Sequence, residues 1–244
     1  MILMVQILCG EEITLIMKLN NVTLVCISSI KIKESLKSLV HCSKLIDFKE
    51  VKFITHSESY VNNFDLFHEL PNNIKIENCR NLTSSEAYSH FIIFDLHKHI
   101  FTDYCLIVQN DGFIVNPNEW TDEFLQYDYI GAPWELKDND YIDPSNNHIR
   151  VGNGGFSLRS RKLLEVSTKE YISFVSITHG THYKHFDRHY TGEDVNICVH
   201  NRSIYEKYGC KFAPYELACK FSVERIVDKE LQKSTFGCHA RVLS

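Results

Sequence analysis

The stretch over residues 106–114 constrains the fold of this chain most. An apolar run rich in β-branched residues stops at the polar sequence Gln-Asn-Asp-Gly, and a second short apolar run follows. Continuous apolar runs are typical of parallel strands buried on both faces, and open α/β sheets bind ligands beyond the carboxyl ends of such strands. The pattern predicts that Asp111 lies at a strand end in a crevice, where a carboxylate can hold a divalent metal ion. A simple hairpin turn is the alternative, because Asn-Asp-Gly also favours turns.

The chain before Asp111 alternates between strand and helix patterns. Three apolar runs predict strands and two amphipathic segments predict helices: 22–27, 50–55 and 74–76 for the strands, and 30–46 and about 86–100 for the helices. Thr83 and Glu86 have the spacing of a capping box for the second helix. Such alternation predicts a mostly parallel sheet covered by helices. The pattern is less regular after Asp111, with helices predicted near 160–169 and 194–208.

Neither a repeat nor a linker divides the chain. We therefore expect one α/β domain over residues 21–244, with a Rossmann-like N-terminal half and an irregular C-terminal half, after an N-terminal extension over residues 1–20. Residues 1–19 are apolar, but they carry Glu11 and Glu12 and lack a basic start. They are predicted to form neither a signal peptide nor a transmembrane segment.

Composition excludes some functions. The 244 residues include 26 basic and 31 acidic side chains, and the formal net charge of −5 leaves no basic surface for nucleic acid. The nine cysteines are odd in number and show no metal-finger spacing. We therefore expect reduced, mostly buried thiols and a cytoplasmic location.

Three glycines in four positions mark the segment 151–160. They allow the backbone to pass close to a ligand or to form a tight turn, and the spacing matches no phosphate-binding loop. Ser160 is predicted to cap a helix that carries Leu163 and Leu164.

Two acids and several histidines are further candidates. Glu193 and Asp194 precede a predicted helix, where acids are favoured as caps and where one carboxylate could also act as a general base. His239 follows a glycine near the end of the chain, and alone it indicates little. His179, His182, His185 and His189 have spacings that could bind zinc, although a solvated, locally basic loop explains them better.

Together these segments resemble a glycosyltransferase of the GT-A class, and most closely a family of glycosyltransferase-like domains known as DUF5672. The family occurs in bacteria, microbial eukaryotes and large DNA viruses, so a viral member would lie in the host cytoplasm. The resemblance covers roughly residues 85–240, whereas the first 80 residues resemble only a generic nucleotide-binding half. It is carried by Tyr88-Ser89, 106–114, Asn116-Pro117, Trp120, 127–134, 151–160, 193–195, 211–214, Phe221-Ser222 and Phe236-Gly-Cys-His239.

The resemblance implies roles for individual residues. Gln109, Asn110 and Asp111 occupy the place of the Asp-x-Asp motif, whose last acid binds the Mn²⁺ or Mg²⁺ that bridges the donor diphosphate. His239 falls where many GT-A enzymes supply a second ligand to that metal. The other implied sites are donor contacts at Ser28 and Ser29, a sugar and acceptor pocket at Trp134, Asn153, Gly154 and Gly155, and catalytic acids at Glu193 and Asp194.

Two departures and one open question accompany these roles. Gln109 replaces the first acid of Asp-x-Asp, which removes a charge from the metal site, and the usual Phe-Gly-Phe-His sequence here reads Phe-Gly-Cys-His. Tyr127, Tyr129 and Trp134 could form apolar walls for a sugar ring or belong to the core.

The function implied is a metal-dependent hexosyl- or pentosyltransferase. It would move a sugar from a nucleotide-sugar donor, expected to be UDP-linked, to a hydroxyl of a glycan or protein, with inversion and with Asp194 favoured over Glu193 as the base. A degenerate protein that only binds nucleotide sugars or glycans is one alternative, motivated by Gln109. A nucleotidyltransferase on a similar sheet is another, because fold does not determine function.

Overall fold

The computed structural model describes residues 16–135, 141–174 and 192–240. Within these ranges two sheets form, the larger with strand order β3-β2-β1-β4-β7-β6 and the smaller with order β5-β9-β8. The strands are β1 (Met17–Ile27), β2 (Ile46–His56), β3 (Ile74–Cys79), β4 (Tyr104–Val108), β5 (Phe113–Ile114), β6 (Tyr129–Gly131), β7 (Phe156–Ser160), β8 (Ser222–Val223) and β9 (Gly237–Cys238).

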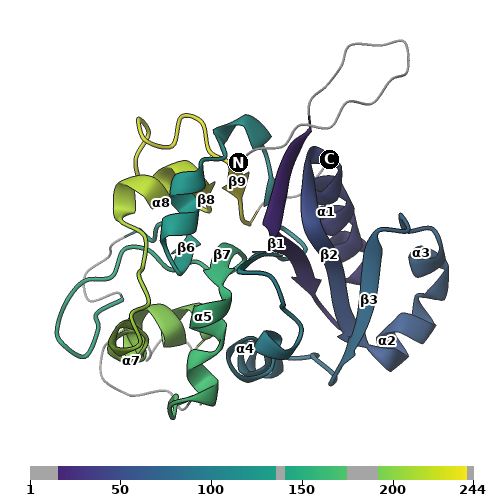
Figure 1. Ribbon diagram of the computed structural model, residues 1–244, viewed down its shortest axis with the longest axis horizontal. Coiled ribbons are helices and arrows are strands. Elements are labelled where there is room, and N and C mark those ends of the chain that lie inside the picture. Colours follow the sequence, from purple (N-terminus) through teal and green to yellow (C-terminus); the bar gives the residue numbers. More distant parts are fainter. Residues whose placement is uncertain (1–15, 136–140, 175–191, 241–244) are drawn as a thin grey trace.

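Helices cover both faces of the larger sheet (Figure 1). They are α1 (Ile32–Leu45), α2 (Ser57–Asn62), α3 (Phe64–His68), α4 (Ser85–Phe94), α5 (Arg161–Leu164), α6 (Glu193–Val195), α7 (Arg202–Lys207) and α8 (Tyr215–Phe221). Four 3₁₀ turns and one π-helical turn complete the described elements: Leu96–Lys98, Pro117–Glu119, Asp122–Gln126, Val166–Thr168 and, for the π turn, Asn196–His200.

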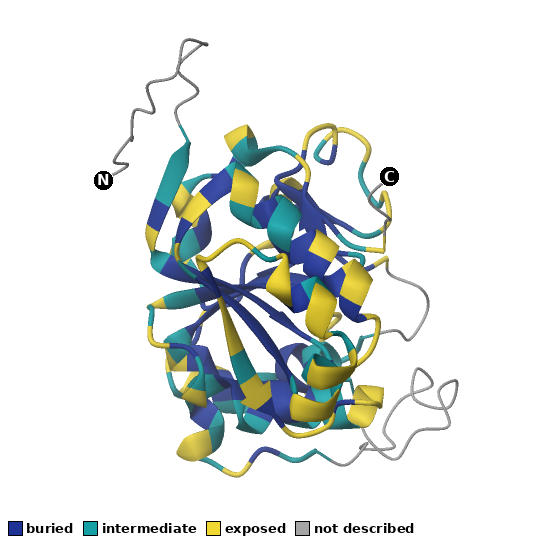
Figure 2. Ribbon diagram, turned by 90° about the vertical axis from the view of Figure 1, so that its right-hand side faces the viewer, coloured by how far each residue is buried: buried dark blue, intermediate teal, exposed yellow. Residues whose placement is uncertain are grey.

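The apolar sequence of β1 explains its central place. Alternate side chains face opposite sides of a strand, so Leu24 and Cys26 pack with α1 while Val25 and Ile27 pack with α4. β1, β2, β3 and β4 are mutually parallel; β7 runs antiparallel to β4, and β6 runs antiparallel to β7 and so in the direction of the first four strands. Figure 2 shows these strands buried between two helical layers. The predicted fold class, a mostly parallel sheet flanked by helices, is therefore confirmed.

Several element boundaries differ from those predicted. β1 begins at Met17 and pairs with β2 there, so residues 17–20 belong to the sheet and not to an extension. Ser84 caps α4 by accepting a hydrogen bond from the Ala87 N–H (3.1 Å), in place of the predicted capping box. That helix ends at Phe94, before a 3₁₀ turn, and a π-helical turn interrupts the helix predicted over 194–208.

Two predictions about side chains are confirmed. Ser160 caps α5 by accepting a hydrogen bond from the Leu163 N–H (3.0 Å). The eight cysteines that the structure describes are all buried free thiols, while Cys9 lies outside the described residues.

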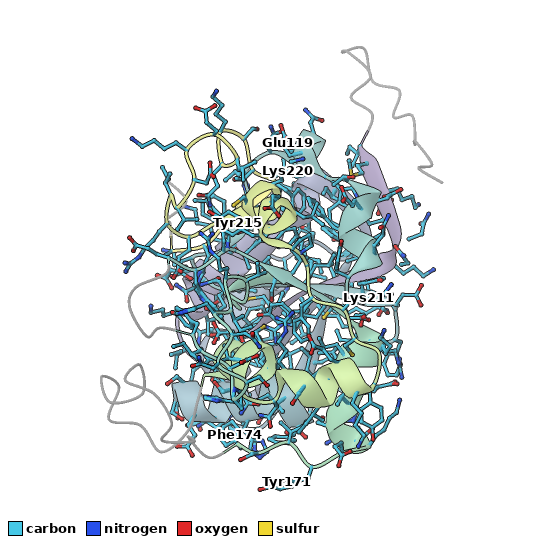
Figure 3. The ribbon with its side chains drawn as sticks, turned by 90° about the vertical axis from the view of Figure 1, so that its left-hand side faces the viewer. Glu119, Tyr171, Phe174, Lys211, Tyr215 and Lys220 are labelled. Carbon is cyan, nitrogen blue, oxygen red and sulfur yellow. The ribbon has the colours of Figure 1, made fainter. Side chains whose placement is uncertain are left out.

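The C-terminal half carries an aromatic cluster that fixes β9 beside β5. Phe236, just before β9, is fully buried and packs against the rings of Trp120, Phe156 and Phe221. Tyr215 is the first residue of α8, and the guanidinium of Arg150 lies 3.6 Å from the centre of its ring. Figure 3 shows the side of the molecule that carries Tyr215. In the part of the chain that the structure describes, no helix is long and apolar enough to cross a membrane.

Candidate active site

The strand order of the larger sheet reverses between β1 and β4. These adjacent parallel strands end at Ile27 and Val108, and their carboxyl ends lie at the same edge of the sheet. Open α/β sheets bind ligands at such a point. Asp111 follows β4 as predicted, and the Gly112 N–H closes a turn onto the Gln109 carbonyl oxygen (3.2 Å). The turn does not make a hairpin, because β5 pairs with β9 instead of β4.

A cavity of about 200 Å³ opens at this switch point. Ser28, Gln109 and Asn110 line it, together with Ile27, Ile30, Ser35, Leu82, Ser84, Ser85 and Tyr88. None of these residues is charged, so the cavity suits a neutral, polar group. The Tyr88 hydroxyl is buried beside the Gln109 side chain and meets the criteria for a hydrogen bond with no described residue, so it can donate to such a group.

Ser29, for which a donor contact is predicted, has its hydroxyl hydrogen-bonded within the protein. It is buried and does not line the cavity; its Oγ accepts a hydrogen bond from the Leu82 N–H (3.1 Å) and its carbonyl oxygen accepts one from Ser59 (3.0 Å). Ser29 therefore holds the wall of the cavity in place.

Asp111 and His239 face each other although 128 positions separate them in the sequence. Nε2 of His239 lies 3.4 Å from Oδ1 of Asp111, and Nδ1 lies 3.7 Å from Oε1 of Glu224. The adjacent His239 side chain holds the pKa of Asp111 below its ordinary value. Burial alone would lower the pKa of His239, but the carboxylates of Asp111, Glu224 and Asp194 raise it. The backbone of His239 is held in place by its N–H, which donates a hydrogen bond to the Val223 carbonyl oxygen (2.9 Å).

This pair fits a divalent cation that is completed by other ligands. Oδ1 of Asp111 is buried, and within the described part of the chain it lies beside Nε2 of His239 without accepting a hydrogen bond. Two ligands about 2.1 Å from one Mg²⁺ ion lie about 3 Å apart at a right angle, close to the 3.4 Å between these two atoms. Among the described residues, no three His, Cys, Asp or Glu side chains are gathered to hold a metal. Phosphate oxygens and water would have to supply the other ligands.

The glycine segment brings this pair close to the acidic pair. A Cβ added at Gly155 would overlap Nε2 of His239, and a Cβ added at Gly154 would overlap Oε1 of Glu193. Asn153 is buried and its side-chain oxygen accepts a hydrogen bond from the Gly155 N–H (3.3 Å). Glycine is therefore required at both positions by the side chains packed against them.

The two acids at 193 and 194 have different environments. Glu193 is 4% exposed, and its Oε2 lies 2.6 Å from the guanidinium of Arg159, which is fully buried. Asp194 forms no ion pair with any residue in the described ranges; its Oδ2 accepts a hydrogen bond from the Gly154 N–H (3.2 Å) and its Oδ1 one from the Val195 N–H (2.8 Å). Burial and the nearby charge of Glu193 raise the pKa of Asp194 to about 7. Asp194 therefore suits a general base, whereas Glu193 is committed to an ion pair.

The aromatic residues lie mainly in the core. Tyr129 is fully buried and its hydroxyl donates to the Gly152 carbonyl oxygen (2.5 Å). Trp134 is 4% exposed, stacks on Tyr141 with ring centres 3.9 Å apart, and covers Gly152. Tyr127 packs partly buried against the core. Tyr129 therefore belongs to the core and does not form a wall for a sugar ring. Trp134 packs against Gly152 and so supports the glycine segment.

The family is identified by residues 72–239. This range matches the model of a family described as "Protein of unknown function (DUF5672)". The chain belongs to the DUF5672 family. The match includes Asp111, the glycine segment, Asp194 and His239, so all the candidate residues except Ser28 and Ser29 lie within it.

One solved glycosyltransferase structure shares the fold of the DUF5672 chain. It resembles mouse xyloside xylosyltransferase 1 in the apo form, with a TM-score of 0.51 and 13% identity over 91% of this chain and 97% of that one. It also matches a glycosyltransferase involved in the glycosylation of the major capsid of PBCV-1, with a TM-score of 0.47 and 13% identity over 91% and 94% of the two chains. No curated protein sequence matches the chain. At such identities the likeness is one of fold, and the first structure confirms the predicted GT-A-like fold.

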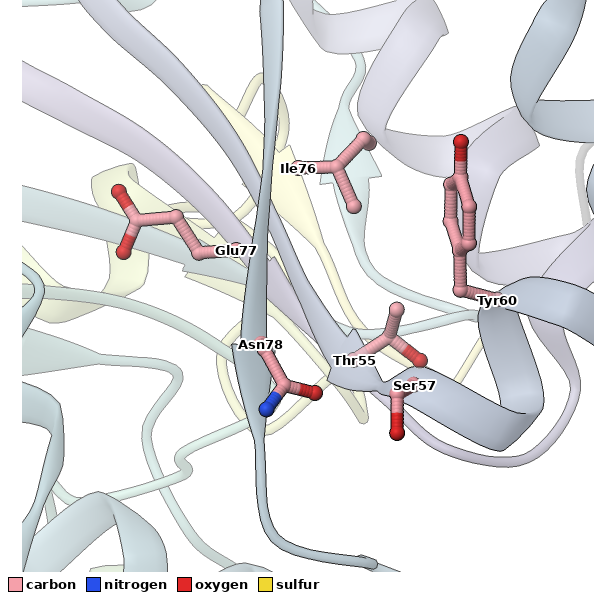
Figure 4. Close-up of a pocket in the computed structure, with 6 residues that line it drawn as sticks. All are labelled: Thr55, Ser57, Tyr60, Ile76, Glu77 and Asn78. Atoms are coloured by element: carbon pink, nitrogen blue, oxygen red, sulfur yellow. The ribbon is translucent and has the colours of Figure 1, made fainter.

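Other features of the DUF5672 chain lie outside this site. A second cavity, of about 320 Å³, lies where β2 and β3 end beside α2, and Thr55, Tyr60 and Asn78 are among its lining residues (Figure 4). None of the predicted site residues lines it. His179, His182, His185 and His189 lie outside the described residues, so the zinc alternative stays a prediction.

Proposed function

We propose that this protein is a metal-dependent glycosyltransferase that moves a sugar from a nucleotide-sugar donor, expected to be UDP-linked, to a hydroxyl of a glycan or protein. The observation that carries the proposal is the arrangement around the glycine segment. The Asp111–His239 pair packs against Gly155, and Asp194, a carboxyl with a pKa near 7, bonds to the neighbouring Gly154. A ligand pair for a cation and a separate base are the groups that transfer from a diphosphate requires.

Different residues of the site have different roles in this proposal. The neutral cavity beyond β1 and β4 would take the nucleoside, with Tyr88, Gln109 and Asn110 as hydrogen-bonding groups. Asp111 and His239 would hold Mn²⁺ or Mg²⁺, which when bound stabilises negative charge on the leaving diphosphate. Asp194 would accept the proton of the acceptor hydroxyl. At the same time the acceptor oxygen would bond to the anomeric carbon, and the bond from that carbon to the phosphate oxygen would break. A base on the face opposite the leaving group implies an inverted product.

Calorimetric titration with UDP, with and without Mn²⁺, tests the donor half of this proposal. We expect UDP to bind much more tightly when Mn²⁺ is present. Equal binding without the cation would contradict metal dependence. Binding without any turnover over a panel of nucleotide sugars would instead favour the degenerate binding protein, the candidate that Gln109 motivates.

Replacing Asp111 by asparagine should lower Mn²⁺-dependent UDP affinity by at least about tenfold, because the lost ligand charge is worth about 1.4 kcal/mol or more. Titration calorimetry measures this effect, with circular dichroism to verify the fold. Asp65→Asn, an exposed substitution on α3, is the matched control and should bind like the wild type. An unchanged affinity in Asp111→Asn would remove this residue from the metal site.

The rate of transfer should rise with pH and level off above about pH 7. The pKa of Asp194 is raised to about 7 by burial and by Glu193, and only the ionised carboxylate can accept a proton. The stability of the fold should depend on pH in the opposite direction. The folded protein binds the Asp194 proton more tightly than the unfolded chain does. This contribution to stability is therefore complete below the ordinary pKa of 3.8 and is lost as the pH rises towards 7. A kcat–pH profile that is flat from pH 5 to 8 would contradict the assignment.

A further inference from the structure

Lys31, the residue just before α1, has an unusual conformation and no charged partner. Its φ angle is +49°, in the left-handed region that side chains other than glycine seldom adopt. The residue is exposed, and it forms no ion pair with any residue that the structure describes. A cation is therefore presented at the carboxyl end of β1, where the strand order of the sheet reverses.

Contacts of α1 place Lys31 beside the turn that carries Asp111. The Ser35 N–H donates to the Lys31 carbonyl oxygen (3.0 Å), and Ser35 lines the cavity together with Gln109. One turn further on, the Ser38 hydroxyl donates to the Gly112 carbonyl oxygen. Residues spaced by four and three positions share one face of a helix, so this face of α1 runs along residues 109–112 and Lys31 lies at its open end.

The charge of Lys31 acts at the candidate metal site. The adjacent His239 side chain lowers the pKa of Asp111 most and burial opposes it; the charge of Lys31 is one of the further influences that lower this pKa. No residue that lines the cavity is charged, so nothing in that lining can neutralise a phosphate. Gln109 also replaces one of the two acids that the Asp-x-Asp pattern would supply. The Lys31 ammonium group therefore meets less local carboxylate charge that could compete with a phosphate for it.

We infer that the Lys31 ammonium group binds the diphosphate of the nucleotide donor, beside the phosphate oxygens that the metal leaves accessible. This inference rests on the proposed function. A lysine ammonium acts on phosphate as a point charge, so it opposes the negative charge that develops as the sugar departs. Lys31 precedes residues 72–239, so the assignment comes from this chain's own contacts and not from the family match.

Nucleotide binding to three variants tests the inference. The probes are the nucleoside diphosphate that binds the wild type best among UDP, CDP, GDP and ADP, and its nucleoside, in the presence of Mg²⁺ and at low and high salt. Lys31→Gln should weaken diphosphate binding by roughly five- to tenfold at low salt and leave nucleoside binding unchanged, with a smaller loss at high salt. Lys33→Gln, an exposed lysine two positions further along the chain, is the matched control and should bind as the wild type. Lys31→Arg should restore most of the affinity.

The outcomes separate the two claims. Equal diphosphate affinity in Lys31→Gln and the wild type would overturn the role of Lys31 and leave the proposed function intact. Equal losses for the nucleoside and the diphosphate would also overturn it, because they would indicate a change in the cavity. A wild type that binds none of the four diphosphates would contradict the proposed function itself, and the inference with it. Melting temperatures of all variants show whether each one is folded.

Discussion

Replacing Asp194 by asparagine is expected to lower turnover by roughly 10²–10⁴-fold, the usual contribution of a general base. The amide keeps an oxygen that can accept the hydrogen bond from Gly154, so the local structure should persist. It cannot accept a proton from the acceptor hydroxyl. Donor binding should change little, because the carboxylate has no part in holding the nucleotide or the metal.

Steady-state kinetics and calorimetry on the same samples check this expectation. Turnover should fall while the affinity for the nucleoside diphosphate stays within about twofold of the wild type, a difference well below 1 kcal/mol. NMR of the product should show inversion at the anomeric carbon. A product with retained configuration would contradict the assignment of a base to either acid, and a normal rate in Asp194→Asn would exclude Asp194 alone.

Replacing Arg159 by methionine should destabilise the protein by about 3–5 kcal/mol, because it leaves the buried Glu193 carboxylate without its partner. The two groups lie 2.6 Å apart, and neither side chain is more than 5% exposed. Urea unfolding, followed by circular dichroism, measures the loss. Arg202→Met, which breaks an ion pair with Glu206 at the helix surface, is the matched control and should cost less than about 1 kcal/mol.

A second substitution identifies the cause of that loss. Glu193→Gln in the Arg159→Met background removes the unpaired charge and should recover part of the stability, which is the coupling expected of groups in contact. If the double variant were as unstable as the sum of both single variants, the ion pair would not explain the burial of Glu193. Its assignment as a structural residue would then be wrong.

The turn after β4 and the glycine segment could be predicted because their signals are local. An apolar run that stops at Gln109 indicates a strand end directly, and closely spaced glycines indicate close approach at Gly154 and Gly155. The ordered motifs also brought His239 into the prediction, although its own sequence context indicates little. The structure adds the reason for its position, since β9 pairs with β5 and brings His239 to Asp111.

Other features could not be predicted because their causes are distant in the sequence. The sequence around Glu193 does not indicate that its carboxylate forms an ion pair with Arg159, 34 positions earlier. Likewise, no local pattern predicts that Glu224 lies beside His239. The first residues of β1 were missed because Asn20 and Asn21 interrupt the apolar pattern, while pairing with β2 keeps the strand extended. Ser29 follows Ser28 directly, yet only its contacts with Leu82 and Ser59 reveal that it is held within the protein and does not line the cavity.

Release of nucleoside diphosphate from a panel of nucleotide sugars tests the central claim most directly. The full-length protein is incubated with UDP-, GDP-, CDP- and TDP-linked sugars in Mn²⁺ or Mg²⁺, and again after the metal has been chelated. The account predicts that at least one sugar nucleotide is cleaved, that chelation stops the reaction, and that Asp111→Asn and Asp194→Asn both slow it. The absence of any release, with pyrophosphate formed instead from a nucleoside triphosphate, would contradict the account and favour a nucleotidyltransferase.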